Sequence, residues 1–170
     1  LLEKLGVEIE WLRPPVGQAG IDACGSTFPP EAREAIDASD AALFGATSGL
    51  SAGALFYLRW GKQTYANVRP ARFRCGFKSP LARPEGVDFV IVRENLEDLY
   101  LFLEGEVEEL APLNLVSPTA RRAVVEMSPG RYGLKVITEA GSERISRFAF
   151  ELARKRKERG LPGRVSSGTK

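Results

Sequence analysis

The stretch that decides the fold is residues 58–70, which read LRWGKQTYANVRP. Arg59 ends a helix-like run in which Ala52, Leu55 and Arg59 recur at i, i+3 and i+7 and so share one helical face. Ten residues later, Arg69 ends a strand-like run, residues 65–69, whose odd positions are polar. Arginine carries a planar fork of donors that matches a carboxylate two bonds at a time. The stretch therefore predicts a pocket for a small carboxylate.

A second stretch, residues 87–100, reads VDFVIVRENLEDLY and adds a third arginine and a phenol. Its apolar opening, Val87 to Val92, predicts a strand that is buried on both faces of a sheet. Arg93 closes that strand, and Tyr100 follows seven residues later. Three arginines at element ends, with a phenol nearby, suggest a ligand that carries several carboxylates.

Composition narrows the class of protein. The chain has 170 residues, 44% hydrophobic and 27% charged, which is typical of a folded globular protein. A net charge of +2 is too small to imply a nucleic-acid or membrane partner, and no apolar run reaches the length of a membrane span. Cys24 and Cys75 give no disulfide framework, so we expect a cytoplasmic protein.

The sequence contains no histidine, which limits the chemistry of the chain. Histidine-based catalytic triads and histidine metal sites are excluded for this chain taken alone. Any proton transfer near neutral pH must use Lys, Tyr, Asp, Glu or water.

The remaining patterns predict an alternation of helices and strands. We expect strands at residues 7–12 and 41–46, a helix that starts within residues 27–31 and ends near Ser39, and a helix opened by residues 47–49. Short strands at residues 106–110, 123–127 and 132–137 should form a β arm. Thr138 should cap a final helix that ends in the basic run 154–159, and solvation of that run is favoured over phosphate binding.

Arg59, the run YANVRP at residues 65–70 and the run VRENLEDLY at residues 92–100 together resemble one known family. These motifs are similar to those of the β-decarboxylating dehydrogenases, which include isocitrate, isopropylmalate, homoisocitrate and tartrate/malate dehydrogenases. The resemblance extends from about Gly17 to the last residue. It implies an α/β fold, an isopropylmalate dehydrogenase-like α/β/α sandwich. Residues 1–70 would be the central part of the first domain, which binds cofactor and substrate, and residues 71–170 the second, dimer-forming domain.

The resemblance also implies an activity. It is metal-dependent oxidative decarboxylation of a 2-hydroxy dicarboxylic acid, with hydride transfer to NAD or NADP. Arg59, Arg69 and Arg93 would hold the substrate carboxylates, and Tyr100, strengthened as an acid by neighbouring positive charge, would protonate the enolate. Lys170, the last residue of VSSGTK, matches the family's base. Simpler interpretations are ion-paired arginines, a core tyrosine and a solvated terminal lysine.

Cofactor residues and partners are likewise implied by the resemblance. Thr47, Ser48 and Asn95 would lie near the nicotinamide cofactor, although Thr47 and Ser48 could instead cap a helix. Aspartates for Mg²⁺ or Mn²⁺ would follow Lys170, and the family's glycine-rich opening strand would precede the chain, so we expect the middle of a longer protein. A homodimer would share each active site between Tyr100 of one chain and Lys170 of the other.

Two departures from the family pattern bear on substrate and activity. Ala52 and Leu55 stand where the isocitrate enzymes carry polar residues, so an isopropylmalate-like or malate/tartrate-type substrate is favoured over isocitrate. Leu96 replaces the usual threonine and Asp98 the usual glycine, and Asp98 could oppose ionisation of Tyr100. The alternative is therefore a non-catalytic, truncated or regulatory relative that acts through its dimer interface.

Overall fold

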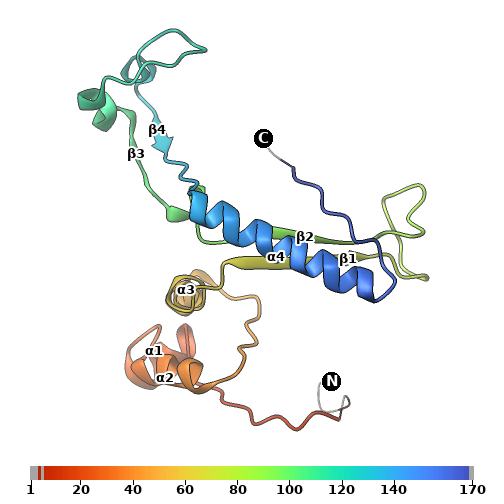
Figure 1. The fold of residues 1–170 in the computed structure, drawn as a ribbon. Helices are drawn as coiled ribbons and strands as arrows, with labels where there is room; N and C mark the ends of the chain where they lie inside the picture. The colour runs from red at the N-terminus through yellow and green to blue at the C-terminus, as the bar shows by residue number, and fades with distance from the viewer. Residues whose placement is uncertain (1–3, 5, 169–170) are drawn as a thin grey trace. The chain divides into compact units, whose positions relative to one another are not determined.

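The computed structural model describes residues 4 and 6–168 of the chain (Figure 1). Its internal contacts divide it into two compact units, Leu1–Gln63 and Thr64–Lys170, and each is described by itself. The predicted domain boundary between residues 70 and 71 stays a prediction.

The first unit contains short helices: α1 (Gln18–Cys24), α2 (Pro30–Ala38), the 3-10 turn η2 (Gly49–Ser51), α3 (Ala52–Phe56) and the π-helical turn η3 (Tyr57–Gly61). The predicted start and end of α2 are confirmed, with Pro30 in its first turn, Glu31 near its positive end, and Ser39 as its C-cap. The helix predicted from residue 47 to Arg59 is a composite that changes from 3-10 to α to π geometry.

The strands predicted at residues 7–12 and 41–46 were wrong. Both segments lack ladder hydrogen bonds in the part of the chain that the structure describes. Their apolar side chains are largely exposed, as Leu43 is at 79% and Val7 at 58%. A strand satisfies its backbone groups only when another strand lies beside it, and the described residues offer these segments no such partner.

The second unit is built on an antiparallel pair of strands, β1 (Ala66–Arg72) and β2 (Asp88–Glu94). In this register Asn67 lies opposite Arg93, and Arg69 lies opposite Ile91. Directly opposed residues project from the same face of a sheet. One face therefore carries the three polar residues Asn67, Arg69 and Arg93, and the other carries the even-numbered residues of β2.

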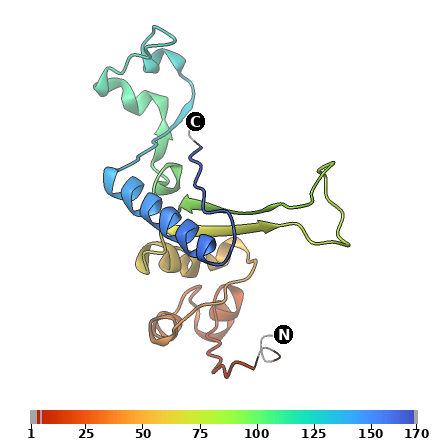
Figure 2. The same cartoon turned by 45° about the vertical axis from the view of Figure 1, so that its right-hand side comes forward.

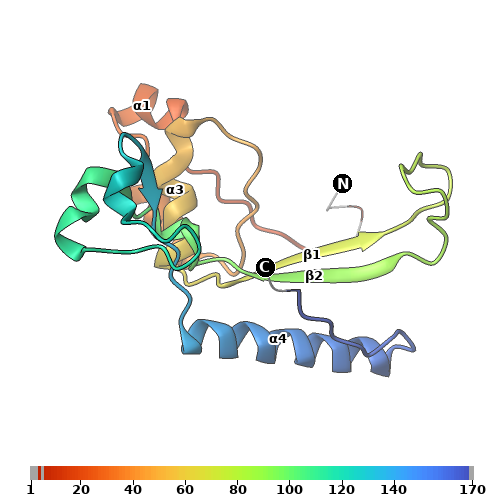
Figure 3. The same cartoon turned by 90° about the horizontal axis from the view of Figure 1, so that it is seen from above.

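Helix α4 (Glu139–Glu158) lies along that second face, as Figure 3 shows. Arg144 donates two hydrogen bonds to Glu94, of 3.0 and 2.8 Å, and Arg156 donates one of 2.7 Å to Asp88. Because Glu94 and Asp88 are the two ends of β2, these ion pairs fix the helix along the whole strand. Thr138 accepts a hydrogen bond from the Gly141 amide at 3.0 Å, so its predicted role as helix cap is confirmed.

The expectation that β2 is covered on both faces was wrong for the described chain. Phe89 is 50% exposed and Ile91 is 51% exposed, because α4 covers only the opposite face. Beyond these strands, the ribbon continues into the long connection 73–87, which Figure 2 shows extending from its end.

The predicted arm is only partly β structure. Strands β3 (Glu104–Glu106) and β4 (Arg131–Gly133) pair, but the 3-10 helices η5 (Val107–Leu113) and η6 (Val124–Met127) replace the strands expected at residues 106–110 and 123–127. The third expected strand, at residues 132–137, is shorter than predicted, because β4 ends at Gly133. A reciprocal capping box of Glu106 and Glu109 favours the helical start of η5.

None of the helices within residues 4 and 6–168 has both the length and the apolar character that a membrane crossing requires.

Candidate active site

The predicted site residues divide between the two units. Arg69, Arg93, Asn95 and Tyr100 belong to the second unit, and Thr47, Ser48, Leu55 and Arg59 belong to the first. Lys170 lies outside the described residues, so its assignment as the base stays a prediction.

Arg93 and Tyr100 are in direct contact. Arg93 Nη1 donates to the phenol oxygen of Tyr100 at 2.5 Å, and its guanidinium carbon lies 4.6 Å from the centre of that ring. Arg93 Nη2 donates to Asn95 Oδ1 at 3.1 Å. The end of β2 and the turn that follows it therefore bring together the predicted substrate-binding arginine and the predicted acid.

Two asparagines extend this contact to the neighbouring strand. Asn95 Oδ1 also accepts a hydrogen bond from Asn67 Nδ2 at 3.4 Å, while Asn67 Oδ1 accepts one from Arg69 Nε at 2.9 Å. Asn95 Nδ2 donates to the Thr64 carbonyl at 3.2 Å. A continuous row of hydrogen bonds thus runs from Arg69 to Tyr100, and we call these five side chains, Arg69, Asn67, Asn95, Arg93 and Tyr100, the arginine–tyrosine network.

Asn67 belongs to this network, although the sequence analysis assigned it no role. The available signal was its place between the arginines on the polar face of β1, but the register that sets it opposite Arg93 could not be derived from the sequence. Asn95 was predicted to contact the cofactor. The structure shows it only 7% exposed, with its amide bonded to protein groups, so it acts at least as a structural link.

Within residues 4 and 6–168, protein carboxylates do not neutralise the positive charges of the network. Among the described residues, no Asp or Glu forms an ion pair with Arg69 or Arg93, and Arg93 Nε is buried without a hydrogen-bond partner. The acidic residues of β2, Asp88 and Glu94, are on the other face and are paired with α4. Two unneutralised guanidinium groups held by amides form a site that favours a bound anion.

The turn between Arg93 and Tyr100 is anchored to the start of α4. Glu94 Oε1 accepts hydrogen bonds from the Asn95 and Leu96 amides, at 3.1 and 3.0 Å. Glu97 accepts one from the Thr138 hydroxyl at 2.5 Å and one from the Thr138 amide at 3.0 Å. The Thr138 hydroxyl and amide lower the pKa of Glu97 below its ordinary value, so this carboxylate is ionised at neutral pH.

Gly141, in the first turn of α4, allows this close approach of Glu97. A Cβ at residue 141 would clash with the Glu97 carboxylate in its present position, so a larger residue there would have to displace that carboxylate.

The two departures from the family pattern have structural explanations. Leu96 is 5% exposed and contributes to the core beneath the turn. Asp98 has φ +67° and ψ −145°, a conformation that glycine adopts far more easily, and its carboxylate accepts a hydrogen bond from the Leu99 amide at 2.9 Å. A glycine at residue 98 would therefore have less backbone strain than Asp98. The Asp98 carboxylate bonds to the next residue of the chain and not to Tyr100.

In the first unit, Arg59 lies in the middle of the π-helical turn, half-buried, with its guanidinium carbon 5.5 Å from the ring of Trp60. Leu55 is half-buried one turn earlier. Thr47 and Ser48 are exposed in the segment before η2, and Ser48, at the N-cap position, makes no side-chain capping bond. Helix capping therefore does not account for the Ser48 hydroxyl.

The described residues do not offer a metal site. Across residues 4 and 6–168, no three Cys, Asp or Glu side chains gather in a way that could hold a metal ion. The expectation of metal-binding aspartates beyond Lys170 stays a prediction.

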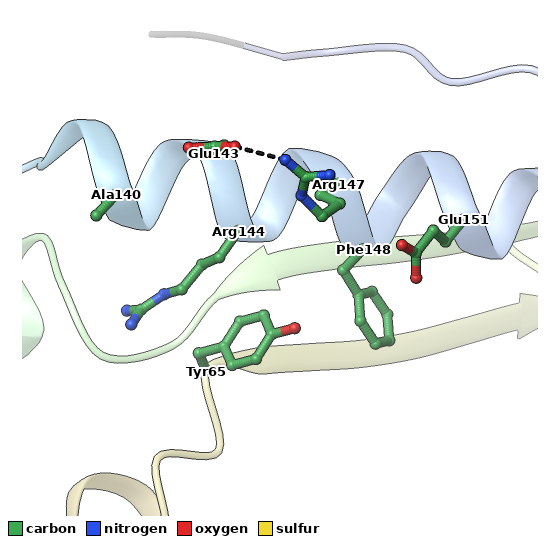
Figure 4. A pocket seen from close by; sticks show the side chains of 7 residues that line it. All are labelled: Tyr65, Ala140, Glu143, Arg144, Arg147, Phe148 and Glu151. Atoms are coloured by element: carbon green, nitrogen blue, oxygen red, sulfur yellow. Dashed lines mark hydrogen bonds and ion pairs between the residues drawn. The ribbon is translucent and has the colours of Figure 1, made fainter.

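A pocket of about 360 Å³ lies on the surface of α4, apart from the arginine–tyrosine network (Figure 4). Tyr65 was predicted to share the polar face of β1, and this was wrong, because its ring meets Phe148 edge-on at 6.3 Å and lies 5.2 Å from the Arg144 guanidinium. Tyr65 precedes the first residue of β1, so the alternation of the strand does not apply to it. Arg147 in this pocket is paired with Glu143, which leaves no clear anion site there.

Comparison with known proteins agrees with the class that the fold defines, an α/β protein. The model of the isocitrate/isopropylmalate dehydrogenase family matches residues 1–166, so the chain belongs to this family. The predicted family and the predicted α/β fold are thereby confirmed.

The individual relatives are dehydrogenases that are named for different substrates. The chain is 36% identical over 170 residues to the 3-isopropylmalate/3-methylmalate dehydrogenase of Methanocaldococcus jannaschii, covering 100% of this chain and 44% of that protein. It is 34% identical over 167 residues to the isocitrate/homoisocitrate dehydrogenase of Thermus thermophilus, covering 95% of this chain and 43% of that protein.

A solved structure, that of isocitrate dehydrogenase from Methylococcus capsulatus, matches with a TM-score of 0.61 and 27% identity, over 92% of this chain and 42% of that one. The chain thus spans less than half of the length of the relatives it matches.

Proposed function

We propose that the protein containing this chain is an NAD- or NADP-dependent β-decarboxylating dehydrogenase. Its substrate would be a 2-hydroxy dicarboxylic acid, which it oxidises at the hydroxyl-bearing carbon and then decarboxylates. The observation that carries this proposal is the arginine–tyrosine network, in which two unneutralised guanidinium groups lie in one row with a phenol.

Arg69 and Arg93 would hold the substrate carboxylates, with Arg59 as the third anchor. A guanidinium has five N–H donors. Arg93 uses Nη1 on Tyr100 and Nη2 on Asn95, and its buried Nε has no partner among the described residues. Each terminal nitrogen of Arg93 carries two N–H groups, so one N–H on each remains for a carboxylate, and the asparagine links would keep both arginines fixed while it binds.

Tyr100 would supply the proton that completes the reaction. Its phenol oxygen accepts a hydrogen bond from Arg93, and Tyr100 would pass its own proton to the enolate carbon left by decarboxylation. The guanidinium stabilises the negative charge that then remains on the phenol oxygen. Lys170 would remove the proton of the substrate hydroxyl during oxidation.

The proposal of a nicotinamide cofactor rests on membership of the family, not on a cofactor site among the described residues. Bound NAD or NADP would accept the hydride, and the exposed hydroxyls of Thr47 and Ser48, together with Asn95, are proposed to lie near it. Mg²⁺ or Mn²⁺ would need ligands from outside residues 4 and 6–168, so no step of the mechanism is assigned to the metal.

The substrate is proposed to be isopropylmalate-like or of the malate/tartrate type rather than isocitrate. Ala52 and Leu55 are half-buried and apolar, so they can contact an alkyl group but cannot hydrogen-bond a third carboxylate. The name of the Methanocaldococcus jannaschii relative is in line with this preference, whereas the Thermus thermophilus relative is named for isocitrate and homoisocitrate.

The assembly is proposed to be a cytoplasmic homodimer with shared active sites. The β3–β4 region exposes large apolar side chains, among them Leu113 at 62% and Val116 at 64%, which a second subunit could cover. Each site would combine Tyr100 of one chain with Lys170 of the other.

A non-catalytic relative remains the second candidate, favoured by Leu96 and Asp98. The mass of the natural protein separates the two, since a mass near 18.6 kDa would favour this candidate and about twice that mass would favour the enzyme.

Steady-state kinetics of the full-length protein tests the proposed function. We expect turnover with NAD or NADP, with kcat/KM highest for isopropylmalate, malate or tartrate. The highest value for isocitrate would overturn the substrate assignment, and no turnover of any of the four acids would overturn the dehydrogenase itself.

A further inference from the structure

The turn that carries Arg59 has an uncommon geometry. Within η3, the Lys62 amide donates to the Tyr57 carbonyl at 2.9 Å, a hydrogen bond that spans five residues. Such π-helical turns are rare, occur mostly as single turns inside helices, and are frequent at functional sites. Arg59 is the middle residue of this one.

The two ends of the turn are held by the same carboxylate. The Tyr57 hydroxyl donates to both oxygens of Asp37, at 2.7 and 2.9 Å, and the Lys62 ammonium forms an ion pair with Asp37 Oδ1. Asp37 belongs to α2, twenty residues before Tyr57. The residues joined by the backbone bond of the turn are therefore joined again by their side chains.

The contacts among Asp37, Tyr57 and Lys62 shift the pKa values of all three side chains. Lys62, and then Tyr57, lower the pKa of Asp37 below its ordinary value, and Asp37 in turn raises the pKa of both partners. Asp37 is thus a carboxylate, and Lys62 an ammonium, at neutral pH.

Packing around Tyr57 makes the arrangement specific. Its ring lies 5.6 Å from the Phe28 ring and 4.8 Å from the Arg33 guanidinium carbon. A Cβ on Gly61 would come within 2.5 Å of the Tyr57 ring, so the last residue of the turn must be small for the ring to take this position.

We propose that Asp37 is a positioning residue for substrate binding, which fixes the π-helical turn from both ends and so sets the direction of the Arg59 guanidinium. This proposal rests on the proposed function, in which Arg59 binds a substrate carboxylate. A bidentate arginine–carboxylate contact is sensitive to small displacements, so loosening the turn should weaken the substrate complex more than it affects the fold.

The test measures binding of 3-isopropylmalate to the full-length protein by titration calorimetry, which needs no turnover. The variants are Asp37→Ala and Tyr57→Phe, each with and without Arg59→Ala. Asp40→Asn is the matched control, because Asp40 is an exposed carboxylate near the same helix end with no ion pair or hydrogen bond to another described residue. Melting temperatures are recorded for every variant.

We expect Asp37→Ala to raise Kd about tenfold and Tyr57→Phe about threefold, while Asp40→Asn changes nothing. In the Arg59→Ala background, Asp37→Ala should change Kd less than about twofold, because the group that it positions is gone.

Each contrary result has its own meaning. If Arg59→Ala leaves Kd unchanged, the role of Arg59 in the proposed function is wrong and the positioning proposal fails with it. If Arg59→Ala weakens binding but Asp37→Ala does not, or does so equally in both backgrounds, only the positioning proposal is overturned. Should Asp37→Ala prevent folding, Asp37→Asn and Tyr57→Phe, which retain more of the local contacts, decide the question by the same comparison.

Discussion

The β1–β2 sheet and the β3–β4 hairpin are both antiparallel pairs, but they differ in what covers them. The sheet pairs seven residues of each strand, and α4 lies on one face, held by Arg144 and Arg156. The hairpin pairs three residues of each strand and continues into 3-10 helices with exposed apolar side chains. The sheet with its own helix carries a row of bonded polar side chains, whereas the β3–β4 pair leaves large apolar side chains in solvent.

The largest predicted change is a loss of kcat/KM when Arg93 of the arginine–tyrosine network is replaced. Arg93→Lys keeps a positive charge but loses the planar fork that reaches both Tyr100 and Asn95. In the full-length protein we expect kcat/KM to fall about a hundredfold, with little change in melting temperature. A variant that instead unfolds would show that Arg93 is mainly structural.

The next prediction concerns the contribution of the α4–β2 contact to the free energy of unfolding. Arg144→Met removes the bidentate partner of Glu94, whose side chain is only 17% exposed and also holds the turn after β2. We expect the free energy of unfolding to fall by about 1–2 kcal/mol, measured by urea denaturation.

Arg154→Met is the control for this change, because it removes a more exposed ion pair within α4, that with Glu158. Equal losses in the two variants would contradict the special role of the helix–sheet contact.

A smaller change in stability is expected at Asp98, where the backbone before Tyr100 is strained. Asp98→Gly and Asp98→Ala both remove the hydrogen bond to Leu99, but only glycine relaxes at φ +67°. The glycine variant should therefore be more stable than the alanine variant by about 1 kcal/mol in denaturant titrations. Equal stability of the two would mean that residue 98 does not hold this conformation in solution.

The smallest effect is a pH dependence of the contact between the turn and α4. Hydrogen bonds from Thr138 lower the folded-state pKa of Glu97 below 4.5, its ordinary value. A lowered pKa contributes stability that is complete above the ordinary value and is lost as the pH falls through the lowered one. The advantage of the wild type over Glu97→Gln should thus shrink below a pH of about 4.5.

Glu108→Gln, at an exposed position of η5, serves as the control for this titration. A Glu97 advantage that stays constant down to the acid limit of folding would contradict the assignment.

Features of the two strand pairs that depend on local sequence could be predicted, and features that depend on distant contacts could not. The strands of the sheet and the α4 cap at Thr138 followed from alternation and capping chemistry, because these are local signals. The hairpin was overpredicted as β structure, since a capping box and Pro112 favour 3-10 turns where apolar runs resemble strands. The role of Asn67 depends on strand register, and the clamp by Asp37 on a contact twenty residues away, and neither leaves a local signal.

We propose above all that two subunits share each active site, with Tyr100 from one chain and Lys170 from the other. Subunit complementation tests it most directly. In full-length protein, Tyr100→Phe and Lys170→Ala are made separately and each is confirmed to be nearly inactive. The two are then mixed under conditions that dissociate and re-form dimers.

Random pairing makes about half of the dimers mixed, and in each mixed dimer one site has an intact tyrosine and an intact lysine. We therefore predict that about a quarter of all sites recover activity after mixing. If tyrosine and lysine came from the same chain, every site would retain one lesion, and activity that stays at the level of the separate variants would contradict the account.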